Sequence, residues 1–571
     1  MPKKNLILQI SNTSSWILIG VLASIVFHYP FIISYFNLFP GDDGDSRFIT
    51  FILEHIYRWF SNKSTFNSPT FFFPEAGTLG LSDVHLLHAL VYSLIRYFDV
   101  SMLKSLSLTI FILNTLTYIA TFCFIRFGMK LNLFPSIIGA LIFSFNSAKL
   151  NVINHTQLQP LLLIPLISWF LILAHDECNK KKHRIQVYLY AFFAILFYHL
   201  QLLTSVYVTW FYSVILFFGI LVLLSTYTAR TYLIKFVKNN LIVIIYTSVI
   251  FILFSIPFFD IYHSIHKNSV GWGYDGHIVN SLPTLKSYLW MGSENMVWGG
   301  ISKQENFSFY WTNQGLGIGI GLVFSCFALL SFYWGWKSFL KVQKGKLALH
   351  WRGPNTLSKI TPIFDTSKYF LLIGILGVSV FFILSLKLDS SLWSIIYSNL
   401  PGSRSIREVS RYALIAYFFV GIFVSLVLHQ IEHKVYCSKI RAVIFVGLSS
   451  LISMFGIVEQ IGVGVSFDSI HSEKWVNAVV RKIDPKCDSF YLMAHPNFPR
   501  PSYAIHTDAM LASHLTNIPT INGYSGNDPK KYSLSNLSNP KAEDIKNSIK
   551  DWKASMNIGG NICIINHEII N

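Results

Sequence analysis

The chain has 571 residues, of which 52% are hydrophobic and only 13% are charged. Soluble globular proteins carry roughly 25% charged residues, so the composition excludes an ordinary soluble fold and favours a membrane protein. The formal net charge is +17. Because lysines and arginines lie in short loops between long apolar blocks, this charge indicates membrane topology and not a nucleic-acid partner.

Eleven apolar segments are near the length of about 20 residues that crosses a bilayer. They cover residues 16–38, 103–126, 131–147, 157–175, 186–203, 206–227, 236–257, 313–337, 367–387, 409–430 and 440–461. No small-residue cleavage site follows the first segment, so we interpret it as a retained helix and not as a signal peptide. The sequence predicts a mainly α, polytopic helical bundle over residues 1–462.

Basic residues alternate from one side of these segments to the other. With a cytoplasmic N-terminus, the inner loops carry basic clusters such as 180–184, 337–359 and 434–441, whereas the outer loops carry acidic residues. This is the positive-inside pattern, provided that residues 83–100 form a juxtamembrane or re-entrant helix and do not cross. We therefore expect a bacterial inner (cytoplasmic) membrane protein whose C-terminal part is periplasmic.

Residues 463–571 have the composition of a soluble domain. Residues 489–494 and 562–565 are predicted strands, and residues 542–556 form a predicted amphipathic helix, which together indicate a small extracytoplasmic α/β domain. Cys487 and Cys563 both lie in this region. They form either a disulfide, as an oxidising compartment allows, or two buried thiols.

The first outer loop, residues 40–102, begins with the acidic sequence Gly41-Asp-Asp-Gly-Asp-Ser-Arg-Phe48. Asp45 suits the N-cap of the amphipathic helix that follows, and the apolar face of this helix suits the membrane interface. We also expect Asp45 to contact the substrate. Asp42 and Asp43 have no comparable structural role in the sequence, so one of them is the candidate general base.

Further polar residues return to the same outer surface, where they are candidates for substrate binding. They are Glu75, Asp83, His85, His155, Gln157 and His199. Each one alone could instead be a polar group of helix packing. The turn 522–526, with His506 and Asp508 upstream, is either structural or part of an acceptor-binding loop.

Arg404, Arg407 and Arg411 are spaced by three and four residues. On a helix this spacing places all three on one face. Planar guanidiniums bind phosphate oxygens in pairs, so the group suits a phosphate site, although it could also contact lipid head groups. Carboxylates and arginines at one outer surface fit a substrate in which a sugar is linked to a lipid phosphate.

The chain resembles the GT-C superfamily of integral membrane glycosyltransferases, and within it a poorly characterised bacterial group that is broadly similar to YfhO-type membrane proteins. The resemblance rests on motifs in the outer loops and the C-terminal region. They are Gly41-Asp-Asp-Gly-Asp-Ser-Arg47 with Leu53-Glu-His-Ile-Tyr-Arg-Trp59, Pro74-Glu-Ala-Gly-Thr-Leu-Gly-Leu-Ser-Asp83, His155-Thr-Gln-Leu-Gln-Pro160, Ser405-Ile-Arg-Glu-Val-Ser-Arg-Tyr412 and Asn522-Gly-Tyr-Ser-Gly-Asn-Asp-Pro529.

The resemblance implies a polyprenyl-phosphate-sugar donor and a glycan or glycolipid acceptor of the cell envelope. It implies that Asp42 or Asp43 is the base and that the donor phosphate meets Arg404, Arg407 or Arg411. No cofactor is expected to be required. A divalent cation is not favoured, because the outer turn after the third span has no carboxylate, and we assign no metal ligand.

Three other functions remain open. A transporter or flippase would show repeats and polar groups near mid-membrane, which the sequence lacks. A polymerase or ligase would act on a diphosphate-linked glycan. A non-catalytic membrane protein would use the C-terminal region as a binding module. The acidic first loop favours the transferase.

Overall fold

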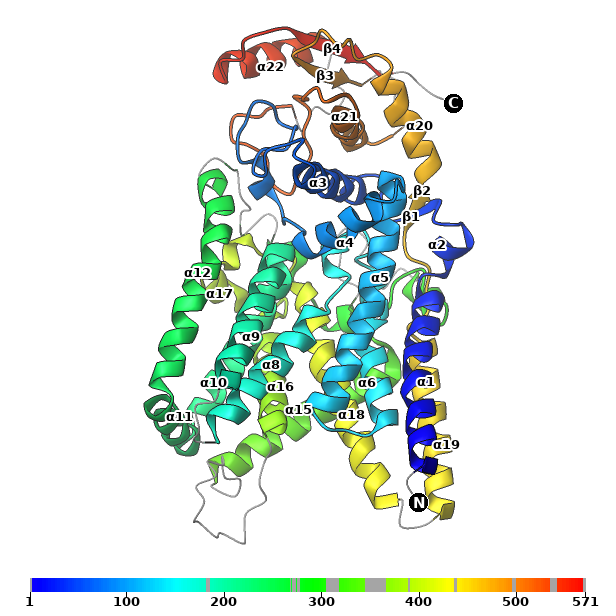
Figure 1. Ribbon diagram of the computed structural model, residues 1–571, viewed down its shortest axis with the longest axis vertical. Coiled ribbons are helices and arrows are strands. Elements are labelled where there is room, and N and C mark those ends of the chain that lie inside the picture. Colours follow the sequence, from blue (N-terminus) through cyan, green and yellow to red (C-terminus); the bar gives the residue numbers. More distant parts are fainter. Residues whose placement is uncertain are drawn as a thin grey trace.

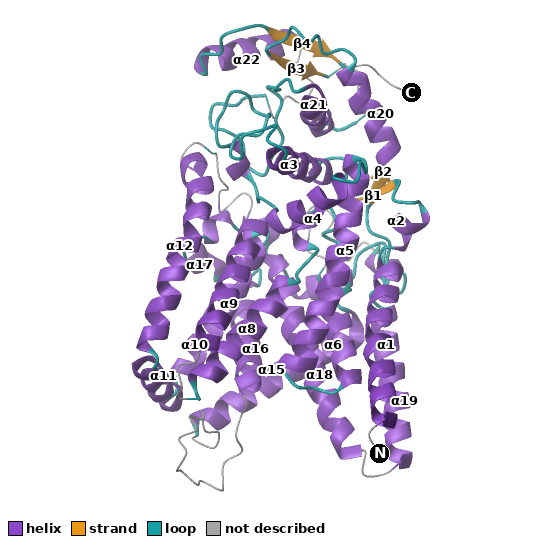
Figure 2. Ribbon diagram, viewed as in Figure 1, coloured by secondary structure: helices purple, strands orange, loops and turns teal. Residues whose placement is uncertain are grey.

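The computed structural model describes residues 3–180, 185–266, 269, 274, 278–303, 318–344, 366–388, 391–435, 439–494, 500–534 and 542–567. Long helices form an elongated bundle, and the first outer loop and the C-terminal segment form a cap at one end of it (Figure 1). Strands are confined to the cap and its junction with the bundle (Figure 2). We call residues 463–567 the C-terminal segment.

Eight helices of the described part are long and apolar enough to cross a membrane, some of them counted with the short turns that extend them. They are α5 (Met102–Cys123), α6 (Leu133–Ser144), α8 (Leu163–Cys178), α9 (Ile185–Thr204), α10 (Val206–Leu224), α12 (Leu241–His266), α16 (Thr366–Ser385) and α18 (Ala413–Val435). The other three predicted spans correspond to α1 (Lys3–Phe27), α15 (Gly321–Gln343) and α19 (Lys439–Val458). The predicted polytopic, mainly α fold is confirmed.

Several predicted spans differ in their boundaries. The span predicted at 16–38 corresponds to α1, which begins at Lys3 and ends at Phe27. The segment predicted at 236–257 begins at Leu241, because a separate helix, α11 (Tyr227–Asn239), precedes it and contains the basic residues Lys235 and Lys238. The span predicted at 313–337 is helical from Gly321 and continues to Gln343. The first residues of this predicted span, 313–317, lie outside the described residues. The same holds for residues 181–184 and 345–365, which contain basic residues of two predicted inner loops.

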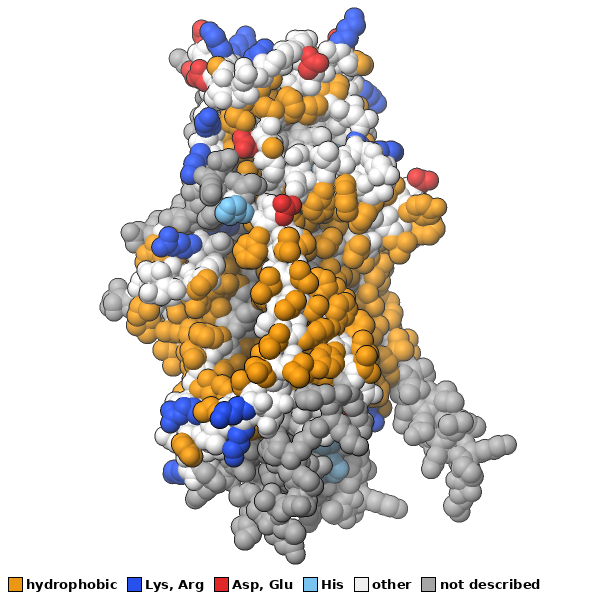
Figure 3. Space-filling model, turned by 60° about the vertical axis from the view of Figure 1, so that its left-hand side comes forward, with side chains coloured by type: hydrophobic (Ala, Val, Ile, Leu, Met, Phe, Trp, Pro, Cys, Tyr) orange, Lys and Arg blue, Asp and Glu red, His pale blue; other side chains and the backbone are white. Residues whose placement is uncertain are grey.

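Apolar side chains form a band over the middle of the face shown in Figure 3, and charged side chains gather above and below it. The N-terminus and the cap lie at opposite ends of the molecule (Figure 1). Helix α4 (Leu86–Arg96) lies at the cap end. Its 11 residues span roughly 16 Å, too short to cross the hydrocarbon core. The prediction of a short, non-crossing helix here is confirmed.

Glycines bring two membrane helices into close contact. A Cβ on Gly377 of α16 would lie 1.8 Å from the carbonyl oxygen of Ile215, and one on Gly219 of α10 would lie 1.9 Å from that of Ile373. Small residues at such crossings let backbones approach, which is how helices associate without a hydrophobic driving force. The outer end of α10 carries part of the site described below.

Helix α3 (Asp45–Phe60) lies between the bundle and the C-terminal segment (Figure 1). Its apolar face was predicted to lie in the membrane interface, and this prediction is wrong. Phe48, Phe51 and Ile56 are buried, and the Phe51 ring stacks on His514 of α21 (Ser502–Thr516) at 4.2 Å. Protein therefore covers the face that we assigned to lipid.

The core of the cap crosses the predicted domain boundary at residue 463. One hydrophobic cluster contains Phe51 and Phe72 of the first outer loop together with Phe490, Met510 and Trp552 of the C-terminal segment. Strand β1 (Leu38–Pro40) also pairs antiparallel with β2 (Ser466–Asp468). The two parts of the sequence therefore share one core.

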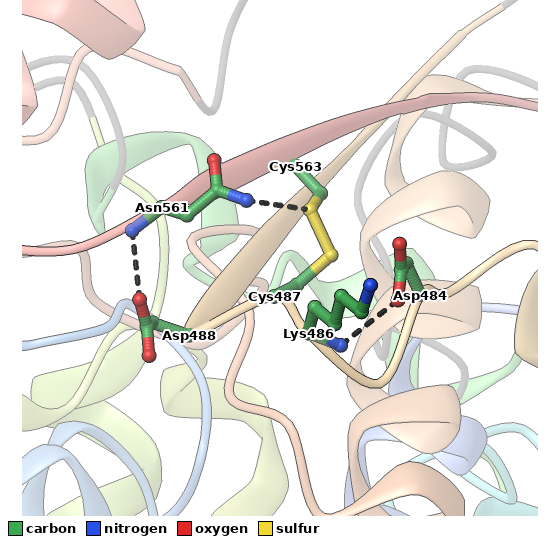
Figure 4. The surroundings of a disulfide bond; sticks show 6 residues. All are labelled: Asp484, Lys486, Cys487, Asp488, Asn561 and Cys563. Atoms are coloured by element: carbon green, nitrogen blue, oxygen red, sulfur yellow. Dashed lines mark hydrogen bonds between the residues drawn. A yellow bond between two sulfur atoms is a disulfide. The ribbon is translucent and has the colours of Figure 1, made fainter.

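The C-terminal elements match the sequence-based expectation. Strands β3 (Ser489–Met493) and β4 (Ile562–Asn566) pair in parallel, and α22 covers Ala542–Ser555. Cys487 and Cys563 form a disulfide across this pair, and Asn561 bonds to both Asp488 and the Cys563 sulfur (Figure 4). The alternative of two buried thiols is therefore excluded.

We expect reduction of this disulfide to destabilise the cap. A cross-link between residues 76 apart in sequence restricts the unfolded chain and contributes about 4 kcal/mol in the chain-entropy model. Dithiothreitol should therefore lower the thermal unfolding midpoint of the purified wild-type protein, but not that of the variant Cys487→Ser/Cys563→Ser. Cys326→Ser, at an exposed free cysteine, is the control. An equal response of the wild type and the double variant would contradict this expectation.

Candidate active site

The acidic loop, residues 41–45, connects β1 to α3 at the outer end of the bundle. Asp42 accepts hydrogen bonds through Oδ1 from the backbone N–H groups of Gly44 (3.1 Å) and Asp45 (2.8 Å), and through Oδ2 from the Asn154 amide (3.1 Å). The expectation that Asp42 has no structural role is therefore wrong. Asp45 is also not the N-cap: it is the first residue of α3, and Gly44 occupies the cap position.

Asp43 makes ion pairs on both of its oxygens. Nη1 of Arg47 lies 3.2 Å from Oδ1, and Nη2 of Arg500 lies 2.6 Å from Oδ2. This pairing gives Asp43 a structural role that the sequence did not indicate. Burial raises the pKa of Asp43 above its usual value, although Arg47 and Arg500 oppose the increase. Asp43 is the less suited of the two predicted bases because guanidiniums occupy both of its carboxylate oxygens.

Asp45 points toward groups from distant parts of the chain. Its Oδ1 accepts a hydrogen bond of 2.6 Å from the Tyr524 hydroxyl, and Oδ2 lies 3.2 Å from Nδ1 of His155. Burial and the neighbouring Asp42 raise the pKa of Asp45 to about 6, against the lowering effects of Tyr524 and Arg411. This carboxylate is thus charged at neutral pH but can accept a proton readily.

The three predicted arginines do not share one helix face, and this prediction is wrong. They lie in an irregular segment with two short turns, η8 (Ser403–Ser405) and η9 (Val409–Tyr412). Gly402, with φ of 81°, and an extended Ile406 interrupt the helical geometry that the spacing requires. Arg404 is exposed and lies over the Tyr397 ring, away from the other two.

Arg407 and Arg411 lie close enough to the acidic loop for their charges to act on it, while Nε of Arg407 also lies 3.3 Å from Oε1 of the adjacent Glu408. Their charges act on both Asp45 and His155, and together with burial they lower the pKa of His155 well below its usual value, so that the imidazole is neutral. The Arg411 side chain is buried and lies over the Tyr207 ring at 5.3 Å. Its Nε and Nη2 have no hydrogen-bond partner among the described residues.

Asp83 is a second buried carboxylate that Arg411 affects, and it is held at the outer end of α10. Its Oδ1 accepts a hydrogen bond of 2.9 Å from the backbone N–H of Val206, the first residue of that helix. Burial raises the pKa of Asp83 to about 6, although Val206, Arg411 and Gln157 act to lower it. We call Asp45, Asp83, His155, Arg407 and Arg411 the acid–arginine cluster; Gln157 lies at its edge.

Three other predicted binding residues have contacts outside the cluster. Burial raises the pKa of Glu75, and the charge of Lys531 opposes this increase. His199, in α9, bonds to Ser255 of α12 at 3.0 Å. His85 is fully buried against His88, with ring centroids 5.9 Å apart. Substrate contacts of these residues and of Arg404 stay predictions.

The sequence did not assign roles to several residues that shape the site. Tyr524 lies in the turn 522–526, which we left open between a structural and a binding role. The structural role is present, because Asn522 holds the β3 backbone and Tyr524 bonds to Asp45; the acceptor-binding role stays a prediction. Arg500 and Asn154 gave no signal, because single polar residues outside a motif do not show which distant group they contact. Tyr207 accepts the N–H of Arg407 at 2.8 Å.

A metal site is not evident in the part of the chain that the structure describes. Within it, no group of three or more His, Cys, Asp or Glu side chains is placed to hold an ion. The cluster can instead use paired arginines for an anion and carboxylates for a proton.

No protein-family model and no curated protein matches the sequence. The fold is similar to the Archaeoglobus fulgidus oligosaccharyltransferase, in complex with Zn and sulfate, with a TM-score of 0.50 and 11% identity over 90% of this chain and 62% of that one. For AglB of the same organism, in complex with an inhibitory peptide and a dolichol-phosphate, the TM-score is 0.47 and the identity is 10%, over 95% of this chain and 68% of that one. For ArnT from Cupriavidus metallidurans in the apo state, the TM-score is 0.45 and the identity is 10%, over 90% of this chain and 87% of that one.

The first of these similarities confirms the predicted GT-C-like membrane fold. The chain spans 62% of the length of that oligosaccharyltransferase, and at this identity the likeness shows the fold alone.

We expect two carboxyl groups of the site to titrate near pH 6. Infrared difference spectra between pH 7.5 and pH 5 should contain protonated-carboxyl bands that Asp45→Asn and Asp83→Asn each remove in part. In Tyr524→Phe, the band assigned to Asp45 should titrate at a higher pH, because the lost hydrogen bond favours the charged form. A midpoint near pH 4 for Asp45 would contradict this assignment.

Proposed function

On the premise of this GT-C-like fold, we propose that the protein is a membrane glycosyltransferase that moves a sugar from a polyprenyl-phosphate-linked donor to a hydroxyl of a cell-envelope glycan or glycolipid. The observation that carries the proposal is the acid–arginine cluster. It places Asp45 and His155 opposite Arg407 and Arg411, between an apolar helical bundle and a polar cap.

Arg411 and Arg407 are suited to hold the donor phosphate. The phosphate is the leaving group, and its negative charge grows as the glycosidic bond breaks, so fixed guanidiniums stabilise the transition state more than the ground state. Arg411 is only 5% exposed, and two of its nitrogens lack a hydrogen-bond partner among the described residues. A buried guanidinium in this state is poised for an anion with several acceptor oxygens.

Asp45 is the general base that the geometry favours over the predicted Asp42 and Asp43. Its pKa of about 6 lies near neutral pH, where a base is both ionised and able to take a proton from an acceptor hydroxyl. Asp42 is held by three N–H donors and Asp43 by two guanidiniums. We assign both to shaping the loop, and Asp42 also to raising the proton affinity of Asp45.

The proposed orientation places the cap outside the cytoplasm. The positive-inside pattern supports a cytoplasmic N-terminus, and the Cys487–Cys563 disulfide fits an oxidising compartment. In a bacterium this is the periplasmic face of the inner membrane, where lipid-linked sugars meet envelope acceptors. A transporter is less well supported, because the cluster lies at the outer end of the bundle and not near its middle.

The proposal is tested by incubating purified protein with polyprenyl-phosphate-linked hexoses and measuring released polyprenyl phosphate. Asp45→Asn should lower kcat by about 100-fold or more, as expected for loss of a general base. Arg411→Ala should lower kcat/KM for the donor by about 10- to 150-fold, because a charge-assisted contact to phosphate contributes about 1.5–3 kcal/mol. Asp551→Asn, at an exposed position on the cap, is the matched control.

Full activity of Asp45→Asn would leave the transferase but exclude its base, with Asp42→Asn and Asp43→Asn as the next variants. The absence of turnover with every donor would support a transporter or a binding protein instead.

A further inference from the structure

We infer that Arg500 of the C-terminal segment is a positioning residue of the active site, and that it acts by holding the acidic loop through Asp43. The inference rests on the proposed function, because it concerns the loop that carries the proposed base. It makes the C-terminal segment a working part of the site and not an appended binding module.

Arg500 bridges two carboxylates from different parts of the chain. Its Nε donates to Oδ2 of Asp43 at 2.7 Å, and its Nη1 donates to Oδ2 of Asp508 at 2.8 Å. The guanidinium also lies 3.6 Å from the ring centroid of Trp475. The planar fork and the ring beneath it fix the orientation of the side chain, which a lysine could not reproduce because its ammonium is a single point charge.

A second arginine joins the same carboxylates from the opposite side. Arg47 of α3 is fully buried, and it bonds to Asp43, to Asp508 and, at 2.8 Å, to the Thr507 hydroxyl. Nε2 of His567 lies 3.1 Å from Asp508. We call Arg47, Asp43, Arg500, Asp508 and His567 the ion network.

The charges of the ion network balance. Two arginines meet two aspartates, which satisfies the requirement that buried charges be paired. Burial alone would raise the pKa of Asp508, but Arg47, His567 and Arg500 together lower it to about 2, so Asp508 stays charged at any physiological pH. Removing Arg500 would leave Asp43 and Asp508 with Arg47 as their shared guanidinium, so the charges would no longer balance and the network would rearrange.

The acidic loop depends on this network for its position. Asp43 lies between Asp42 and the proposed base Asp45, and its backbone carbonyl accepts a further contact of 3.4 Å from Thr507. A Cβ on Gly44 would lie 3.0 Å from the Tyr503 ring, so the loop fits closely against α21. Because Asp45 is two residues from Asp43, release of the Asp43 side chain would shift the base relative to Arg411.

Two measurements test the inference: hydrogen–deuterium exchange, which does not require catalytic activity, and the donor assay, which does. Hydrogen–deuterium exchange of a peptide that covers residues 41–48 should rise at least several-fold in Arg500→Ala and little in Arg481→Ala, an exposed arginine of the same segment. In the donor assay, Arg500→Ala should lower kcat by about 10- to 100-fold and change the donor KM by less than about 3-fold, because misplacing a catalytic group by about 1 Å can cost 10²-fold.

The variants that follow separate positioning from folding. Arg500→Lys should restore thermal stability in part but not kcat, since it cannot span Asp43 and Asp508. The double variant Asp43→Ala/Arg500→Ala should lose less activity than the sum of the two single losses, because both single variants remove the Asp43–Arg500 pair. Asp45→Asn combined with Arg500→Ala gives the reference for a variant in which the base itself is absent.

Unchanged exchange of residues 41–48 in Arg500→Ala overturns the inference whether or not turnover is detected. Full recovery of kcat in Arg500→Lys, or additive losses in the double variant, also overturns it. Raised exchange in a protein that lacks turnover with all donors would uphold the loop contact and reject the proposed function.

Discussion

The bilayer excludes unpaired charge, and this constraint decides where the chemistry of this protein can lie. A charge in hydrocarbon is costly, so ionisable groups collect at the ends of the bundle or in pairs. The apolar band in Figure 3 and the charges at both ends reflect this sorting. Asp45, Asp83, His155, Arg407 and Arg411 meet at the cap end, where a lipid-linked phosphate would leave the hydrocarbon.

The sequence was most informative where physical rules are local. Apolar segment length predicted the eight described spans, the helices at the other three positions and the short helix at 83–100, and alternation predicted both strands beside the disulfide. The first outer loop was also selected as the candidate site, because it holds three carboxylates within four residues. These features depend on neighbours along the chain.

The errors arose where distant residues decide the outcome. The arginine spacing of three and four indicated a helix, but Gly402 with positive φ and an extended Ile406 break it, and only Arg407 and Arg411 turn inward. The apolar face of α3 was assigned to lipid because the sequence cannot show that α21 covers it. The sequence also could not show that Arg500, 457 residues away, pairs with Asp43.

The C-terminal segment connects these findings. It supplies Tyr524 to Asp45 and Arg500 to Asp43, and it shares a hydrophobic core with the first outer loop. A soluble-looking segment thus completes a site that begins on the other end of the chain. The acidic loop is held from the bundle by Asn154 and from the cap by Arg500, so its geometry requires both parts.

The central claim is that Arg411 and Arg407 bind the phosphate of a polyprenyl-linked donor beside Asp45. The most direct measurement is a cryo-electron microscopy structure of the full chain with bound polyprenyl phosphate. Our account predicts phosphate oxygens at about 2.7–2.9 Å from the Arg411 guanidinium, with the isoprenyl chain entering the bundle. A phosphate bound elsewhere, with Arg411 still without an anion, would contradict it.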